Sequence, residues 1–493
     1  MGWTVIDPHH IGSALIYHGD VLDVAEWMGL RKPKSVNCIV TSPPYYALRD
    51  YKLDPTDWPE VDYSPMPGLP ALHIPAETSC HGLEATPEAY IAHEVLIWRL
   101  LREVLRDDGL AWINIGDGTE DGRRNMLRRM GRPVPDIGLQ PLDWIGIPGR
   151  LQFALQADGW LLRMDNIWAK ASPMPESVSG WRWQRHRVKV ASGSIGRMGD
   201  PATSGHRTHG ASDHPDIQQA KYTDCPGCPT CSPNDGLVLR RGAWRCTKSH
   251  EYILQLAKGP GYFADGIAVA ESAECDRMRG PAEHPCEDTN GNDGLCRRPI
   301  TGTRNPRSVW RLSSRGYGGQ HYATFPVELP LKCIMASISE KGYCANCGKP
   351  WVRVVDREAD MRGAGSGKTV GASDTVAAKR IWERSRALRA AGHDHDNPIP
   401  PVRTLGWRPS CDCRVSIHGQ VHAPPDPVPG VVLDPFSGTA TTGIACQQWG
   451  CEYIGIEKSE DYLQQSIERL AKGESMGMAP ATADAPLFQE QGS

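Results

Sequence analysis

The strongest structural signal in the chain is Val431–Thr442, which reads VVLDPFSGTATT. Its first residues are apolar and predict a short buried strand that ends at Asp434. The small residues that follow predict a tight turn and then a helix that ends near Gly450. A second apolar run, Tyr453–Ile456, predicts another strand, and the acid Glu457 follows it. This order of strand, small-residue loop, helix, strand and acid is typical of a nucleotide-binding half of a doubly wound sheet, in which the acid binds ribose hydroxyls.

A second motif lies near the N-terminus. The largely apolar run Val36–Val40 leads directly into TSPPYY, residues 41–46. The run predicts a buried strand, and the two prolines predict that it ends abruptly in a stiff turn. The turn leaves carbonyl oxygens and the Ser42 hydroxyl as acceptors beside Tyr45. Such a turn suits a planar group with an exocyclic amine, its ring stacked on Tyr45 and its amine bonded to Ser42 and the Pro43 carbonyl.

Together the two motifs resemble those of the DNA amino-methyltransferases, which carry Ser/Asp/Asn-Pro-Pro-Tyr and Asp-Pro-Phe-x-Gly-Ser-Gly-Thr-Thr. The resemblance implies a Rossmann-like, S-adenosylmethionine-dependent methyltransferase fold, an α/β fold with a mostly parallel sheet. It implies a catalytic turn made of Ser42, Pro43, Pro44 and Tyr45. It also implies that the cofactor is held by Asp20, Asp434, Pro435, Phe436, Gly438, Thr441, Thr442 and Glu457.

Ala440 in the cofactor motif and Asp20 each raise a further question. The chain departs from the family at Ala440, where the family usually has its second glycine, and a methyl group is tolerated there if φ is negative. Asp20 either contacts the cofactor adenine or caps a helix predicted over Val21–Leu30.

The catalytic turn precedes the cofactor loop, an order that marks the beta group of the family. The resemblance implies direct methyl transfer to an exocyclic amine of a base flipped out of double-stranded DNA. Serine at position 42 favours cytosine N4, and adenine N6 is the alternative. An RNA or protein methyltransferase fits less well because its motif typically starts with Asn. A catalytically inactive zinc protein that binds DNA fits less well because Tyr45, Asp434 and Glu457 are present.

The motif positions predict the domain organisation. The catalytic half is predicted for residues 1–176, and the cofactor-binding half for residues 305–340 and 430–473. Two insertions are predicted, a target-recognition insertion at residues 177–304 and a zinc-knuckle insertion at residues 341–429. Residues 474–493 are predicted to form a disordered tail. Within the catalytic half, Thr86 predicts the start of a helix that ends at Gly109, and residues 116–140 predict a loop that is mobile without a ligand.

The cysteines predict metal sites. The chain has 16 cysteines, and their close pairing within a large chain favours metal ligation over disulfides. A Cys-x-x-Cys-Gly knuckle followed by a second close pair predicts a structural zinc site at Cys344, Cys347, Cys411 and Cys413. A weaker pattern predicts a second four-sulfur site at Cys225, Cys228, Cys231 and Cys246.

Composition sets the expected partners and compartment. The net charge is −4, so contacts with DNA phosphates are expected from local basic clusters. Two clusters are candidates, and solvated loops are the alternative for each: Arg123, Arg124, Arg128, Arg129 and Arg132, and Arg182, Arg185, Arg187 and Lys189. No apolar run is long enough to span a membrane and the first residues are not signal-like, so we expect a cytoplasmic, bacterial or phage-encoded protein. A homodimer and a cognate restriction enzyme remain open as partners.

Overall fold

The computed structural model describes residues 8–23, 34–173, 175–191, 221–272, 303–313, 325–356, 403–414, 416–417, 420–421 and 424–475. The chain divides into two units. The main unit comprises Met1–Ser172 and His250–Ser493, and the insert unit comprises Pro173–Ser249. The predicted insertion of residues 177–304 includes most of the insert unit and also the part of the main unit that begins at His250.

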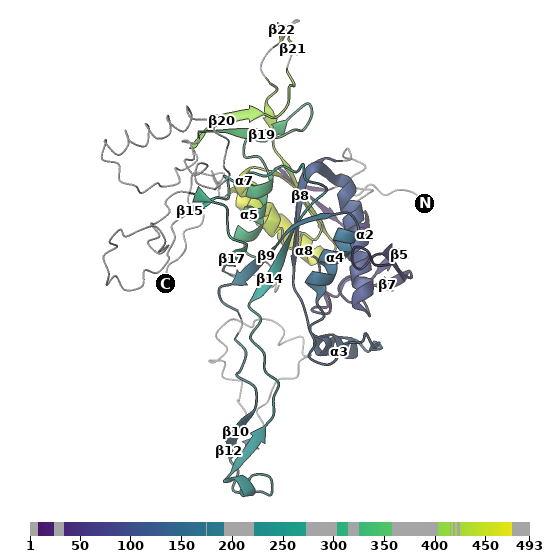
Figure 1. Cartoon of the computed structure of the whole chain (residues 1–493), viewed down its shortest axis with the longest axis vertical. Coiled ribbons are helices and arrows are strands. Elements are labelled where there is room, and N and C mark those ends of the chain that lie inside the picture. The colour runs from purple at the N-terminus through teal and green to yellow at the C-terminus, as the bar shows by residue number, and fades with distance from the viewer. Residues whose placement is uncertain are drawn as a thin grey trace, which may run out of the picture. The chain divides into compact units, whose positions relative to one another are not determined.

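A nine-stranded sheet forms the centre of the main unit, in the order β1-β2-β25-β24-β3-β8-β14-β9-β17 (Figure 1). Strands β2, β25, β24, β3 and β8 run parallel to one another, and β17 runs parallel to β9. Strands β1 and β14 are antiparallel to their neighbours. The bounds are β1 His9–Ile11, β2 Ala14–His18, β3 Val36–Thr41, β8 Leu105–Ile115, β9 Leu161–Lys170, β14 His250–Ala257, β17 Val309–Leu312, β24 Val431–Asp434 and β25 Glu452–Glu457. The predicted mostly parallel sheet is confirmed.

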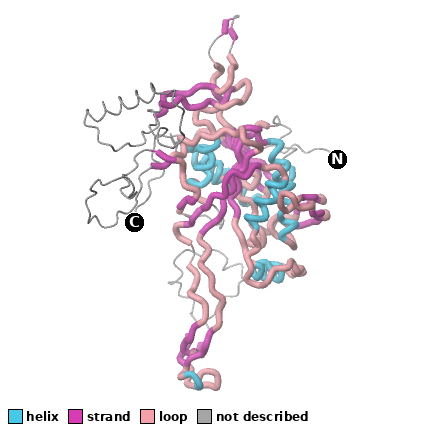
Figure 2. The backbone as a smooth tube through the Cα atoms, in the orientation of Figure 1, coloured by secondary structure: helices cyan, strands magenta, loops and turns pink. Residues whose placement is uncertain are grey.

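Helices cover both faces of this sheet (Figures 1 and 2). Side chains of β3 alternate between two hydrophobic cores: Ile39 packs into the core formed with α2 and α4, whereas Cys38 and Val40 pack into the core formed with α5, α7 and α8. The helices are α2 Pro87–Val104, α4 Ile147–Ala157, α5 Glu328–Ser337, α7 Thr441–Trp449 and α8 Glu460–Ser475. These three layers are those of a Rossmann-like fold.

Side-chain caps mark the starts of two of the described helices, α2 and α8. The Thr86 side chain accepts a hydrogen bond from the Ala89 backbone at 3.2 Å and so caps α2, as predicted. Gly109 does not end this helix, because α2 stops at Val104 and β8 begins at Leu105. Ser459 accepts from the Tyr462 backbone at 3.4 Å at the start of α8.

The loop predicted for residues 116–140 contains a helix instead, α3 Glu120–Arg129. Arg123 is fully buried and its guanidinium donates to both carboxylate oxygens of Glu120, at 2.6 and 2.7 Å. Arg123 therefore cannot face DNA phosphates, and its inclusion in a basic surface cluster was wrong. Arg128 and Arg129 of the same helix are exposed.

Short strand pairs fill the connections. In the main unit these are β4 Thr56–Trp58 with β7 Glu77–Ser79, β5 Val61–Tyr63 with β6 Leu72–Ile74, β15 Glu271–Ser272 with β16 Thr303–Arg304, β18 Tyr343–Cys344 with β23 Pro427–Val428, β19 Trp351–Asp356 with β20 Arg403–Pro409, and β21 Ser416–Ile417 with β22 Gln420–Val421. The insert unit pairs β10 Arg182–Arg185 with β13 Leu237–Arg240, and β11 Arg187–Ala191 with β12 Lys221–Asp224.

Some predictions lie wholly or partly outside the described residues. The predicted helix over Val21–Leu30 is described only as the short 3₁₀ turn η1, Val21–Asp23. The predicted tail overlaps the end of α8, and residues 476–493 are not described.

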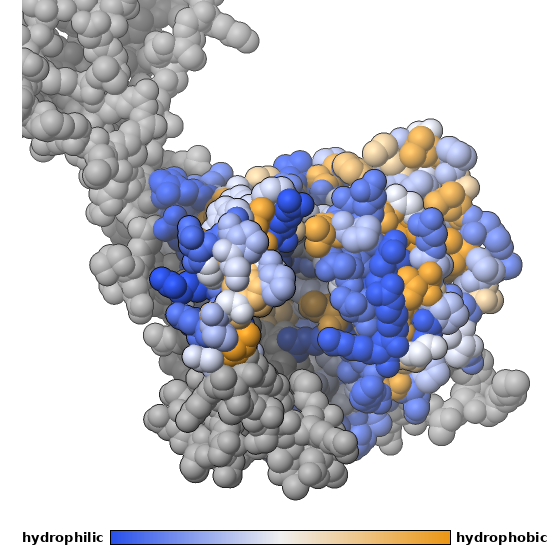
Figure 3. Space-filling view, turned by 90° about the horizontal axis from the view of Figure 1, so that it is seen from below, coloured by the Kyte–Doolittle hydropathy of each residue, from blue (hydrophilic) through white to orange (hydrophobic). Residues whose placement is uncertain are grey.

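Among the described residues, no helix is long and apolar enough to cross a membrane. Hydrophilic side chains predominate on the face drawn in Figure 3.

Candidate active site

A cavity of about 420 Å³ opens where the parallel strands β3, β24 and β25 end. Its volume lies within the range of small-molecule sites, and its position is the one at which open α/β sheets bind ligands. Both sequence motifs contribute to its wall, although they lie at opposite ends of the chain. The predicted residues that line it are Asp20, Ser42, Pro43, Pro44, Tyr45, Pro435, Phe436, Gly438, Thr441 and Glu457.

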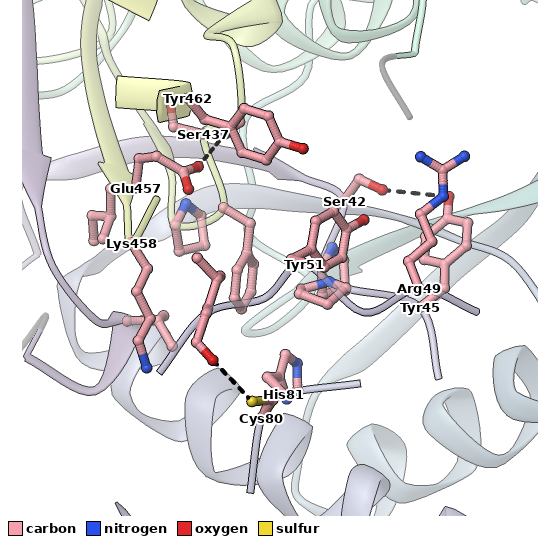
Figure 4. A pocket seen from close by; sticks show the side chains of 18 of the residues that line it. Ser42, Tyr45, Arg49, Tyr51, Cys80, His81, Ser437, Glu457, Lys458 and Tyr462 are labelled. Carbon is pink, nitrogen blue, oxygen red and sulfur yellow. Dashed lines mark hydrogen bonds between the residues drawn. The ribbon is translucent and has the colours of Figure 1, made fainter. Parts of the chain in front are cut away.

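The Ser-Pro-Pro-Tyr turn begins directly after β3 and is held by a hydrogen-bond network (Figure 4). The Tyr45 hydroxyl donates to Glu251 Oε2 at 2.7 Å and receives a hydrogen bond from Ser42 Oγ at 3.3 Å. Asn114 Nδ2 donates both to Tyr45 Oη, at 2.5 Å, and to Glu251 Oε2, at 2.9 Å. Lys170 Nζ donates to Glu251 Oε1. The tyrosine ring is therefore oriented by residues of β8, β9 and β14.

The surroundings of Tyr45 and Glu251 set their protonation states. Burial and the negative charge of Glu251 raise the pKa of Tyr45 well above its ordinary value, so the hydroxyl stays protonated and donates. Burial by itself would raise the pKa of Glu251, but the positive charge of Lys170 and three hydrogen bonds lower it overall. Glu251 is consequently a carboxylate that accepts from Tyr45.

Asp434, at the end of β24, lies beneath the cavity wall. Its carboxylate accepts from Thr41 Oγ1 and Thr442 Oγ1, each at 2.7 Å, and from the Phe436 backbone at 3.1 Å. These bonds join the end of β3 to the cofactor-motif loop and the first turn of α7. Burial raises the pKa of Asp434 to about 6 despite these donors. Asp434 and Thr442 thus support the loop that lines the cavity.

Ala440 precedes α7 and has φ 55° and ψ 41°, in the left-handed region. The condition of a negative φ, under which a methyl group would be tolerated here, is therefore not met. The conformation closes the loop, because the Ala440 backbone donates to Ser437 O at 2.8 Å and its carbonyl accepts from Ile444 N at 3.0 Å. The methyl group is fully buried, so the chain accommodates strain that a glycine would avoid.

Glu457 ends β25 and contributes a carboxylate to the cavity wall opposite the Tyr45 side of the pocket (Figure 4). Its two oxygens accept from the backbones of Ser459 and Gly438, each at 2.7 Å. Burial raises the pKa of Glu457 to about 7, although these backbone donors oppose the rise. A strand-terminal carboxylate beside a tight loop accepts hydrogen bonds from ribose hydroxyls, so the residues present fit an adenosyl group.

Asp20 caps η1, which is one of its two predicted roles, and contact with the cofactor adenine stays a prediction. One of its oxygens accepts from the Leu22 backbone at 3.0 Å and so caps η1. The other accepts from Thr56 Oγ1 at 2.6 Å and from Lys458 Nζ at 2.8 Å. Asp20 also lines the cavity, next to Lys458.

Several lining residues carried no motif of their own. The two sequence motifs include none of Glu251, Asn114, Lys170 and His81, which also line the cavity. His81 stacks on Phe436, with ring centroids 5.5 Å apart. Burial alone would lower the pKa of His81, but hydrogen bonds with Glu84 and Glu94 raise it to about 10. The positively charged His81 ring thus stacks on Phe436 in the cavity wall. Lys458 and Tyr462 line the part of the cavity near Glu457.

Comparison with known proteins decides the family. A family model described as DNA methylase, for N6 and N4 methyltransferases, matches residues 36–347 and 426–468. The chain belongs to this DNA methylase family. It is therefore a DNA methyltransferase, and the methyl donor of that family is S-adenosylmethionine.

Relatives extend the match over nearly the whole methylase chain. Type II methyltransferase M.Cfr9I of Citrobacter freundii and Type II methyltransferase M.XycI of Xanthomonas campestris pv. cyanopsidis are each 30% identical over 474 residues, covering 94% of this chain and 90% of the relative. Among solved structures, PvuII DNA methyltransferase (cytosine-N4-specific) aligns over 96% of this chain and 95% of that chain, at 11% identity and a TM-score of 0.40. That structural score is too low to add to the assignment.

The methylase brings cysteines together in two places. The sulfur atoms of Cys344, Cys347, Cys411 and Cys413 all lie within 4.8 Å of one another, as the predicted zinc site requires. A second cluster joins the sulfurs of Cys225, Cys228 and Cys231 to a ring nitrogen of His186. Cys246, the predicted fourth member, is exposed and is not part of this cluster. The correction is to His186, whose position the cysteine spacing could not reveal.

A third group, His81, Glu84 and His93, is also close enough to hold a metal ion. Its members already pair with one another: Glu84 Oε1 lies 3.0 Å from His93 Nδ1 and 3.3 Å from His81 Nδ1. Burial alone would raise the pKa of Glu84, but its hydrogen bonds with the two histidines lower it to about 2. Ion pairing accounts for this cluster.

Proposed function

We propose that the methylase is a site-specific enzyme that methylates an exocyclic amine of a base flipped out of double-stranded DNA. The observation that carries the proposal is that Ser42 and Tyr45 share one cavity with Glu457. The first two suit an amino-substituted ring, and the third suits the ribose of a methyl donor. One cavity that holds both reactants allows direct transfer without a covalent intermediate.

In this proposal the target base stacks on Tyr45, and its amine donates to Ser42 Oγ and to the Pro43 carbonyl. The network around Glu251 fixes the Tyr45 ring before the base arrives. S-adenosylmethionine, when bound, supplies an electrophilic methyl group on its sulfonium. The amine nitrogen forms the new bond to the methyl carbon as the carbon–sulfur bond breaks, and the amine then loses a proton to solvent.

Cytosine N4 is the favoured target because Ser42 starts the catalytic motif, and adenine N6 is the alternative. Target recognition is assigned to the insert unit and the connections after β14. Several aromatic and basic side chains of the insert unit are exposed, among them Trp181, Trp183, Arg182, Arg185 and Arg187. Basic and aromatic side chains together suit a nucleic-acid surface. A cognate restriction enzyme and a homodimer stay open as partners.

The test is methyl transfer from labelled S-adenosylmethionine to unmethylated duplex DNA, followed by mass analysis of the digested nucleosides. We expect N4-methylcytosine from the wild type and none from Tyr45→Ala. Tyr262→Ala is the matched control, since Tyr262 bonds to Arg163 and does not line the cavity. N6-methyladenine would overturn the choice of base. Label only in RNA or protein would overturn DNA as the substrate, and cofactor binding without any transfer would indicate an inactive enzyme.

We also propose that Cys344, Cys347, Cys411 and Cys413 hold a structural zinc ion. Support comes from the turn that contains the first two cysteines and ends at Gly348, which directly follows Cys347. Gly348 has φ 69° and its backbone donates to Cys344 O at 2.8 Å. A turn of this kind directs two thiolates toward one metal. Zinc analysis of the purified enzyme tests the site: Cys347→Ser should lower the zinc content by about one equivalent. Unchanged zinc content in this variant would refute it.

A further inference from the structure

We propose that the insert unit holds a second zinc ion, bound by Cys225, Cys228, Cys231 and the Nδ1 atom of His186. In this proposal the ion stabilises a unit whose described residues bury few apolar side chains. The inference does not depend on which base the enzyme methylates, or on whether it is active.

The distances between the candidate ligand atoms fit a tetrahedral zinc ion. Cys228 Sγ lies 3.6 Å from Cys231 Sγ and 3.3 Å from His186 Nδ1. Ideal zinc bond lengths give tetrahedral edges of about 3.8 Å between two sulfurs and about 3.6 Å between sulfur and nitrogen. All four ligand atoms lie within 4.8 Å of one another. The four atoms thus already surround a space of the right size.

Backbone hydrogen bonds hold this arrangement in place. The Cys225 backbone donates to His186 O at 2.8 Å, which ties the residue between β10 and β11 to the start of the cysteine loop. Within the loop, Cys231 N and Ser232 N both donate to Cys228 O, at 3.0 and 2.9 Å. Gly227 has φ 123°, a conformation that a side chain at that position would disfavour. The ligand set is therefore built by the local backbone.

The described part of the insert unit buries few apolar side chains. Among its described residues, the buried hydrophobic ones are Cys231 and Val238. Trp181, Trp183 and Trp244 are all more than half exposed. Its described part consists of two short strand pairs and the 3₁₀ turn η2, Ser232–Asn234 (Figure 2). A unit that buries so little apolar surface usually depends on a disulfide or a metal ion.

His186 fits the fourth position better than Cys246 does. Cys246 is exposed and follows β13, outside the cluster of ligand atoms. His186 is partly buried, and the backbone on either side of it belongs to paired strands. Coordination through Nδ1 leaves Nε2 as the protonated nitrogen of a neutral imidazole. Three thiolates and one histidine form a common structural zinc set.

The experiment is zinc analysis of the full-length protein, purified without chelators, by mass spectrometry of the metal. His186→Ala and Cys228→Ser should each lower the zinc content by about one equivalent relative to the wild type. Cys246→Ser is the matched control and should leave it unchanged. Cys347→Ser lies in the other cysteine cluster, so the double variant with His186→Ala should lose about two equivalents.

A second readout guards against variants that fail to fold. His186→Cys keeps four ligands and should retain the zinc that His186→Ala loses. In protein loaded with Co²⁺, His186→Cys should also strengthen the thiolate-to-cobalt absorption, because a sulfur replaces a nitrogen. His186→Ala should be cleaved by protease within residues 173–249 more readily than the wild type. Either unchanged zinc content in His186→Ala or zinc loss in Cys246→Ser would overturn the proposal.

Discussion

Tyr45 and Glu251, which are 206 residues apart in the chain, are joined by a hydrogen bond of 2.7 Å. The tyrosine follows β3 and the acid lies on β14, and β8 separates these two strands in the sheet. Lys170 of β9 donates to the same carboxylate from the opposite side. Three strands thus set the orientation of one aromatic ring at the cavity wall.

Glu251→Gln should slow methyl transfer by about 10- to 100-fold, the range expected when a hydrogen bond to a charged acceptor is lost. The reason is that the neutral amide accepts more weakly from Tyr45 and leaves Lys170 without its ionic partner. Single-turnover rates at saturating cofactor measure this effect. Tyr45→Phe removes the same bond from the other side, so the double variant should be less impaired than the product of the two single effects. Independent effects would show that the bond does not couple the two residues.

Gly116→Ala should displace the Tyr45 ring. A Cβ atom at this position would lie 2.6 Å from Tyr45 Cε2, closer than real contacts allow. We expect at least a tenfold loss of methyl transfer with nearly unchanged cofactor affinity, since the substitution does not touch the Glu457 end of the cavity. Gly118→Ala is the matched control, because its nearest neighbour would be 3.9 Å away. Equal activity in the two variants would contradict this role for Gly116.

Cofactor affinity should depend on pH through Glu457, whose pKa burial raises to about 7. The ribose hydroxyls donate to the ionised form, so affinity should rise with pH up to about 7 and then level off. The stability of the free enzyme follows the opposite course. The raised pKa of Glu457 stabilises the fold below its ordinary pKa of 4.5, and this contribution is lost as pH rises through about 7.

Calorimetric titration with S-adenosylmethionine between pH 5 and 9 measures the dependence. Glu457→Gln should bind more weakly at high pH and should lose the dependence near pH 7. Asp434 remains in this variant and its pKa is raised to about 6, so a residual change centred there is expected. An unchanged profile in Glu457→Gln would assign the titration to another group.

Ala440→Gly should stabilise the protein, because Ala440 has φ 55° and glycine adopts that conformation without strain. The gain is offset in part by the greater freedom of glycine in the unfolded chain, so we expect up to about 1 kcal/mol. The free energy of unfolding in urea measures it. Ala445→Gly, in the middle of α7, is the control and should destabilise by about 1 kcal/mol.

Arg123→Ala should destabilise the protein by about 3 kcal/mol, because it leaves the buried carboxylate of Glu120 without its principal partner. Arg128→Ala, on the exposed side of the same helix, should change stability by no more than about 0.5 kcal/mol. Denaturant unfolding compares the two. If Arg123→Ala instead binds DNA more weakly and is as stable as the wild type, Arg123 belongs to the basic surface cluster.

The sequence by itself determined the features that depend on neighbours along the chain. Two prolines after an apolar run end β3 at residue 41, whatever surrounds it, because each proline removes a ladder donor. Thr86 caps α2 because its hydroxyl reaches a backbone donor three residues on. The cofactor motif predicted a strand, a loop, a helix and a terminal acid from the order of apolar, small and acidic residues along the chain. These local signals predicted the fold class. They also predicted the residues at the two ends of the cavity, which are the Ser-Pro-Pro-Tyr turn and Glu457.

Tertiary structure alone decided which distant groups meet. Glu251 contacts Tyr45 because β14 pairs with both β8 and β9, a pairing set by the sheet and its two cores. His186, rather than Cys246, joins the three cysteines because strand pairing brings its backbone against Cys225. Arg123 is buried because its guanidinium donates to the distant Ala85 carbonyl at 2.9 Å as well as to the neighbouring Glu120. Such contacts depend on the packing of the whole fold, which residue spacing along the chain does not encode.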